Sequence, residues 1–299
     1  MPLSFGVLLL QDRPLDEVLG WARRFDAAGA DSVWVADHLS NPHALDRPWL
    51  DPWLVLGAVA AETQRCRIGP LVSTFVVHSP LSLARKVHTL NVLSGNRLDL
   101  GVGAGGAPVD RAFTGVPDTS VTALVDRLDR GLGALSAALR GDRIDVPPVA
   151  EVAGRPVPPD VAVTFAEGHA AMPPLVVGGQ SRATIDVAAR YADRWNTFAP
   201  GRWGSDMTEA VRRASAHLDE RCLAHGRDPA SVTRSVLLDL TAETSAPTAE
   251  ALADVVGRMA DLGFEECIAY AWADGAVDRP PDQLLSFVAD TLPALRASR

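Results

Sequence analysis

The chain has 299 residues, of which 47% are hydrophobic, and its formal net charge is −9. A chain of this length and composition can bury a large core without disulfides or a structural metal. Its charges are mixed and form no basic block, which argues against a nucleic-acid-binding protein. No apolar run approaches the roughly 18 residues that a membrane helix needs.

Apolar runs and helical patterns alternate along the first third of the chain. Residues 3–10 (LSFGVLLL) predict a strand rather than a signal peptide, because no basic region precedes them and no small-residue cleavage site follows. Two helices open with a capping residue followed by proline, Asp51-Pro52 and Ser79-Pro80. In chain order the expected elements are strand 3–10, helix 15–29, strand 32–36, helix 51–64, strand 67–73 and helix 79–95.

The same alternation continues to the end of the chain. The expected strands are 97–103, 174–179, 194–198, 235–240 and 267–272, and the expected helices are 122–141, 181–192, 205–226, 248–263 and 281–297. Residues 142–173 are rich in proline and predict an irregular insertion rather than a second domain.

Eight strand-then-helix units over about 300 residues predict the α/β class and a (β/α)8 TIM barrel, with one domain over residues 1–299. The strands are continuous apolar runs, as expected of parallel strands buried on both faces. A doubly wound sheet is the alternative, but it needs a switch point and fewer units.

Titratable residues stand where strands should end, and in a TIM barrel those ends carry the chemistry. Asp37 and His38 follow the second strand, and His78 lies in the loop after the third. A lone histidine is more often a packed core residue, but an adjacent acid at a strand end favours a catalytic role. Asp37 is expected to fix the tautomer of His38 or to cap the next segment.

Glycine-rich segments end two further strands. GVGAGG (101–106) fits either a turn with positive φ or a backbone that a flat ligand approaches closely. GGQS (178–181) precedes a helix, so its N–H groups predict an anion site, with a plain cap by Ser181 as the alternative. No histidine or cysteine spacing predicts a metal site. Three scattered cysteines fit a reducing compartment and predict a cytoplasmic protein.

The chain resembles the bacterial-luciferase-like superfamily of flavin- and deazaflavin-dependent oxidoreductases. The matching segments keep the family order and cover nearly the whole chain. They are AGADSVWVADHL (28–39), RIGPLVSTFVVHSPLSLARKVHTLNVLSGNRLDLGVGAGG (67–106) and PPLVVGGQSRATIDVAARYADRWNTF (173–198).

The resemblance implies a flavin-type ring in the barrel mouth. Asp37 and His38 match an acid–histidine pair beside the ring, with His78 as a second catalytic candidate. The implied ring contacts are Asp37, Leu71, Val72, Ser73, Gly103, Ala104 and Gly105, and the implied phosphate loop is Gly178, Gly179, Gln180 and Ser181. Leu71-Val72 matches a third-strand bulge that often contains a non-proline cis peptide.

The resemblance favours coenzyme F420 over FMN, and therefore an F420-dependent oxidoreductase that transfers hydride between the deazaflavin and a small organic substrate. Sugar-phosphate dehydrogenases of the F420 branch carry Glu after the glycine turn, where this chain has Gly106, which argues against a sugar phosphate. An FMN-dependent monooxygenase and a non-catalytic flavin-binding barrel are the alternatives. Family members are often dimers, so the resemblance is compatible with a homodimer but leaves the oligomeric state open.

Overall fold

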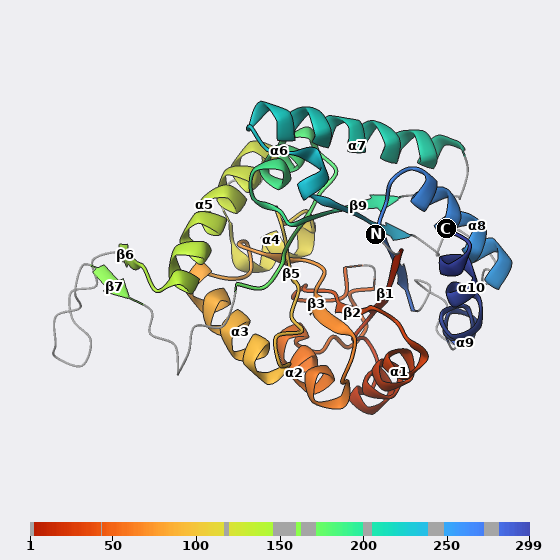
Figure 1. Ribbon diagram of the computed structural model, residues 1–299. Helices are drawn as coiled ribbons and strands as arrows, with labels where there is room; N and C mark the ends of the chain where they lie inside the picture. The colour runs from red at the N-terminus through yellow and green to blue at the C-terminus, as the bar shows by residue number, and fades with distance from the viewer. Residues whose placement is uncertain are drawn as a thin grey trace.

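The fold is a barrel of parallel strands surrounded by helices (Figure 1). The computed structural model describes residues 3–42, 44–116, 120–145, 160–162, 172–199, 205–238, 248–271 and 281–299. The barrel strands are β1 (Ser4–Leu9), β2 (Ser32–Val35), β3 (Arg67–Pro70), β4 (Ser73–Thr74), β5 (Leu100–Gly103), β8 (Leu175–Gly178), β9 (Arg194–Ala199), β10 (Thr233–Leu238) and β11 (Glu266–Tyr270).

The strand order closes the sheet on itself. Neighbouring strands follow the order β3-β2-β1-β11-β10-β9-β8-β5-β4, and every pairing is parallel. The two ends of this order, β3 and β4, are one strand interrupted at Leu71-Val72. Ile68 also forms a parallel bridge with Leu98, just before β5. The predicted (β/α)8 barrel is therefore confirmed, with β3 and β4 together as its third strand.

Apart from α4, the helices lie where the apolar periodicity predicts them. They are α1 (Leu15–Ala28), α2 (Pro52–Glu62), α3 (Pro80–Leu93), α4 (Pro108–Thr114), α5 (Val121–Arg140), α6 (Arg182–Tyr191), α7 (Ser205–Ala224), α8 (Ala249–Asp261), α9 (Asp282–Ser286) and α10 (Leu292–Ala297). The Asp51 and Ser79 side chains cap α2 and α3, each followed by proline as the sequence indicates. Among the described residues no helix is both long and apolar enough to cross a membrane.

The core lies between the barrel and its helices and continues inside the barrel. All residues of β2 and β5 are buried, including Val33 and Trp34, because each strand is covered on both faces. The helices contribute one apolar face each, for example Val18, Ala22 and Phe25 of α1.

Three local features differ from the expected elements. Residues 108–114 form the short helix α4 where the sequence indicates a loop. The last predicted helix is divided into α9, a π-helical turn at Phe287–Thr291 and α10. The insertion contains two short antiparallel strands, β6 (Arg143–Asp145) and β7 (Asp160–Ala162), drawn away from the barrel in Figure 1; its residues 146–159 and 163–171 lie outside the described part.

Candidate active site at the carboxyl end of the barrel

The predicted site residues gather at one end of the barrel, because parallel strands all end at the same edge. Asp37 and His38 follow β2, Ser73 belongs to β4, and His78 follows β4. The two glycine-rich segments begin in β5 and β8 and continue past their ends. Hydrogen bonds join several of these residues directly.

Asp37 is the centre of a buried polar cluster. Its side chain is almost fully buried, and Oδ2 accepts hydrogen bonds from Trp53 Nε1 at 2.9 Å and His78 Nε2 at 2.8 Å, and a third from Ser73 Oγ. Burial raises the pKa of the Asp37 carboxyl, but the hydrogen bonds from His78, Ser73 and Trp53 outweigh it, so the pKa lies below its usual value. Asp37 is therefore an ionised acceptor that ties β2 to β4 and α2.

Both ring nitrogens of His78 are engaged. Nε2 contacts Asp37, and Nδ1 lies 3.3 Å from the Lys86 ammonium of α3. An ammonium can only donate and an ionised carboxylate can only accept, so this network assigns the Nε2–H tautomer. Lys86 also lies 5.8 Å from the centroid of the Trp53 ring.

His38 belongs to a separate pair. Its Nδ1 lies 2.7 Å from Asp110 Oδ2, and Asp110 Oδ1 accepts the Leu39 N–H at 2.9 Å. Trp49 Nε1 donates to the His38 carbonyl at 2.9 Å. The His38 side chain is 24% exposed, and Nε2 forms no hydrogen bond with any residue that the structure describes. One ring nitrogen therefore stays available for a ligand.

The expectation that Asp37 orients His38 is wrong. Consecutive side chains of extended backbone point to opposite sides, so neighbours in sequence at a strand end do not face each other. Asp37 consequently contacts Trp53, Ser73 and His78, whereas His38 contacts Asp110.

The third strand contains the expected bulge. The Leu71-Val72 peptide bond is cis, in agreement with the family resemblance. The Val72 side chain lies against Gly101, Gly103 and Gly178: a Cβ on Gly103 would come within 2.6 Å of Val72 Cγ2, and one on Gly178 within 3.0 Å of Cγ1. Glycines at the ends of β5 and β8 therefore make room for Val72, which gives this end of the barrel an apolar surface.

The turn after β5 requires glycine because of its backbone conformation and its packing against neighbouring side chains. Gly105 has a φ of 90°, and a Cβ there would lie 2.6 Å from Val76 Cγ2. A Cβ on Gly106 would meet nothing within 4 Å, so that position is open to another molecule. Of the two readings of GVGAGG, the positive-φ turn is confirmed at Gly105, and Ala104 beside it is half-buried.

The GGQS segment caps α6. Ser181 Oγ accepts the Thr184 N–H at 3.1 Å, and the Gln180 side chain donates to the Phe198 carbonyl. Gln180 and Ser181 are exposed, and the N–H groups that open a helix have no intrahelical partner. The apolar surface at Val72 and these donors fit a planar group that carries a phosphate. Among the described residues no group of three or more potential ligands could hold a metal ion.

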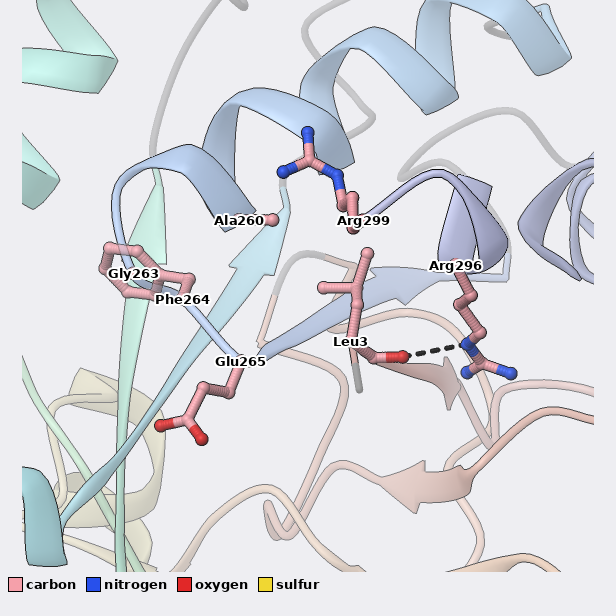
Figure 2. A pocket seen from close by; sticks show the side chains of 7 residues that line it. All are labelled: Leu3, Ala260, Gly263, Phe264, Glu265, Arg296 and Arg299. Carbon is pink, nitrogen blue, oxygen red and sulfur yellow. Dashed lines mark hydrogen bonds between the residues drawn. The ribbon is translucent and has the colours of Figure 1, made fainter. Parts of the chain in front are cut away.

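A cavity of about 280 Å³ lies at the opposite end of the barrel (Figure 2). Its lining includes Leu3 and Glu265, which precede β1 and β11, and its arginines are already bound: Arg296 donates to the Leu3 carbonyl at 2.8 Å and Arg299 to Asp261 at 2.7 Å. A second cavity, of about 500 Å³, lies beside His78 between residues 75–80 and α5. Only the second is at the end where barrel enzymes hold their substrates.

Sequence reasoning missed Asp110 and Lys86, and it did not foresee the hydrogen bonds of Trp49 and Trp53. Asp110 stands in a segment read as a loop, and Lys86 falls inside a predicted helix. The indole N–H groups of the two tryptophans donate to the His38 carbonyl and to the Asp37 carboxylate.

The comparisons with known proteins agree with this architecture. The chain is 27% identical over 300 residues to the phthiodiolone/phenolphthiodiolone dimycocerosates ketoreductase of Mycobacterium kansasii, covering 92% of this chain and 77% of that protein. Its fold matches an F420-dependent secondary alcohol dehydrogenase in complex with an F420–acetone adduct, with a TM-score of 0.77, 17% identity and full coverage of both chains.

A second structure with the same fold contains FMN. It is the oxygenating constituent of 3,6-diketocamphane monooxygenase from Pseudomonas putida, with a TM-score of 0.69, 15% identity and coverage of 97% of this chain and 96% of that one. The family model described as luciferase-like monooxygenase matches residues 3–282. Since that match extends over most of the chain, the protein belongs to the luciferase-like monooxygenase family of oxidoreductases.

Proposed function

We propose that the protein is an F420-dependent oxidoreductase that interconverts a carbonyl compound and its alcohol by hydride transfer. The observation that carries this proposal is the open Nε2 of His38, held from its other side by a buried carboxylate. Two of the similar proteins support the substrate class, since one is named a ketoreductase and the other a secondary alcohol dehydrogenase that uses F420.

In this proposal the mouth residues hold the coenzyme, which supplies or accepts the hydride when bound. The α6 N-terminus would bind its phosphate through backbone N–H groups. The apolar surface at Val72 would lie against the ring. The full proposed set is Asp37, Leu71, Val72, Ser73, Gly103, Ala104 and Gly105 at the ring, and Gly178, Gly179, Gln180 and Ser181 at the phosphate.

The chain's own chemical task is to move one proton. When a carbonyl carbon receives hydride, its oxygen gains negative charge, and His38 in its imidazolium form delivers the Nε2 proton that makes it a hydroxyl. His38 is then left as the neutral Nδ1–H imidazole. In the reverse direction Nε2 removes the hydroxyl proton as the carbon loses hydride. Positioned acid–base catalysis of this kind contributes about 10² to 10⁴ in rate.

Asp37 and His78 support the site in this proposal instead of reacting. Both nitrogens of His78 already have partners, which leaves none for a substrate. Asp37 also accepts a hydrogen bond from Ser73, which lies next to the Leu71-Val72 bulge. The pair therefore holds the surface against which the ring would lie.

An FMN-dependent monooxygenase is the second candidate, supported by the family description and by the FMN-containing structure with the same fold. Oxygen dependence separates the two. We expect reduced F420 to be oxidised without oxygen when a ketone is supplied, with one alcohol formed for each coenzyme consumed. Turnover that needs both reduced FMN and oxygen would establish the monooxygenase instead, and retention of a flavin without turnover would indicate the non-catalytic barrel.

A further inference from the structure

We infer that Asp110 is the positioning residue of the site: it fixes His38 as the Nδ1–H tautomer and so makes Nε2 the atom that exchanges protons. This inference rests on the proposed function and names the group that makes its acid–base residue usable. Asp110 touches neither substrate nor coenzyme in this account and acts through His38.

The two oxygens of the Asp110 carboxylate bind two different groups of the segment His38-Leu39, a ring nitrogen and a backbone N–H. Oδ2 accepts from His38 Nδ1 at 2.7 Å, and Oδ1 accepts the backbone N–H of Leu39 at 2.9 Å. The backbone contact fixes where the histidine's chain lies, and the ring contact fixes how its imidazole turns. An ionised carboxylate has no proton to donate, so Nδ1 must carry one.

Asp110 is held in a buried helical position. It lies in the first turn of α4, is 1% exposed, and its carbonyl accepts the Thr114 hydroxyl at 2.9 Å. An acidic residue is also favoured in the first turn of a helix. Helix α4 begins directly after the glycine turn. The turn that we propose to contact the ring and the residue that orients His38, Asp110, therefore belong to one continuous segment.

The second acid–histidine pair shows what an unavailable imidazole looks like in the same molecule. His78 has Asp37 on one nitrogen and Lys86 on the other. Within the described residues, the second ring nitrogen of His38, Nε2, has no such cation beside it. The two pairs therefore have different roles. Asp37 and His78 fix the bulge, whereas Asp110 and His38 leave Nε2 of His38 accessible.

An Asp110→Asn variant tests the inference, because an amide can turn its NH2 group toward Nδ1 and thereby favour the opposite, Nε2–H tautomer. The tautomer is read by two-bond ¹H–¹⁵N correlation spectra of the cofactor-free protein at a pH where neutral imidazoles dominate. A His38→Gln spectrum assigns the His38 signals among the seven histidines. We expect the Nδ1–H form in the wild type and a shift toward the Nε2–H form in the variant.

The kinetic readout accompanies the spectrum. Loss of the carboxylate that orients a metal-bound histidine typically costs about 10- to 100-fold, and the same orienting role for Asp110 predicts a similar factor. We expect kcat of Asp110→Asn to fall by that factor while the coenzyme Kd changes less than about twofold. Asp26→Asn is the matched control: Asp26 is also a buried carboxylate that accepts backbone N–H groups, from Gln64, Arg65 and Cys66, but it contacts no imidazole.

Two results would overturn the inference. One is an Nε2–H tautomer for His38 in the wild type, which needs no variant and is therefore independent of whether Asp110→Asn folds. The other is an unchanged tautomer in Asp110→Asn with a loss of kcat no larger than that of Asp26→Asn. The spectra require no coenzyme, so a protein that binds neither F420 nor FMN would refute the proposed function alone.

Discussion

The imidazole of His38 carries the proton in the proposed reaction, and a His38→Gln substitution separates that role from coenzyme binding. We expect kcat to fall by about 10² to 10⁴, because no other group at the site replaces the proton donor. The coenzyme Kd, followed by fluorescence, should change less than about twofold. His217→Gln is the control, since His217 lies on α7, where its Nδ1 is 3.4 Å from Glu220 Oε2. Equal kcat values in the two variants would remove His38 from the mechanism.

Asp37 should make the stability of the protein depend on pH. Its folded-state pKa is lowered, so its contribution is fully present above the unfolded pKa of about 4 and is lost as the pH falls through the folded value. Asp37→Asn removes a buried carboxylate from three donors and should cost about 3–5 kcal/mol at neutral pH.

Urea unfolding of wild type and Asp37→Asn at a series of pH values measures this effect. The difference in unfolding free energy between the two proteins should be constant near neutrality and shrink in acid. A difference that grows as the pH falls would contradict the assigned sign.

At the residue scale the sequence identifies His38 but not its partner. An acid next to a histidine at a strand end marks the site, and the alternation of extended backbone then directs the two side chains apart. Asp110 is 72 residues away, and only the closed barrel brings α4 beside the end of β2. The pairing is therefore a property of the fold that local sequence does not encode.

Helix α5 is an element whose two interior glycines have opposite surroundings. A Cβ on Gly131 would lie 2.2 Å from the ring of buried Phe75, whereas a Cβ on exposed Gly133 would meet nothing within 4 Å. Gly131→Ala should therefore cost about 1–3 kcal/mol through overpacking. Gly133→Ala should gain up to about 1 kcal/mol from helix propensity.

Chemical denaturation of the two glycine variants provides a matched comparison, since both place the same residue in the same helix. Equal stabilities would show that Phe75 does not pack against Gly131 in solution. A destabilised Gly133→Ala would mean that the open side of α5 is covered.

Element positions were predictable because periodicity and caps are local. The capping pairs at Asp51 and Ser79 start helices as expected. The break in the third strand was known only from the family resemblance, because its geometry depends on how Val72 packs against Gly103 and Gly178. The helix α4 escaped prediction since its seven residues are too few for periodicity to register.

At the scale of the whole molecule, the two ends of the barrel have different tasks. The end opposite the site carries a buried ionic cluster in which Arg194 lies 3.1 Å from Asp99 and 3.3 Å from Glu266. Burial raises the pKa of Glu266, and the nearby Arg194 only partly offsets it. Arg194→Met should destabilise the protein by about 3–5 kcal/mol, because it leaves buried Glu266 without its cation, whereas Asp99 keeps its pair with Arg67.

The same substitution should leave kcat of the folded fraction within about twofold of the wild-type value, since the cluster lies at the amino ends of β9 and β11. Thermal unfolding and steady-state kinetics together test this. Arg212→Met, which removes an exposed pair with Glu209 on α7, is the control and should change stability by less than about 0.5 kcal/mol. A large kcat loss in Arg194→Met alone would contradict the separation of the two ends.

The overall fold was the most predictable level. Eight strand-then-helix units are redundant, so no single unit decides the fold. The coenzyme was the least predictable, because the helix N-terminus that we propose for phosphate binding and the adjacent apolar surface suit both F420 and FMN.

The most direct test of the central claim is a fluorescence titration of the purified, cofactor-free protein with F420 and, separately, with FMN. The account predicts saturable binding of F420 with a Kd in the micromolar range or tighter, and weaker binding of FMN. Preference for FMN would contradict the deazaflavin assignment and favour the oxygen-using alternative, and binding of neither would contradict a flavin-type site at the mouth of this barrel.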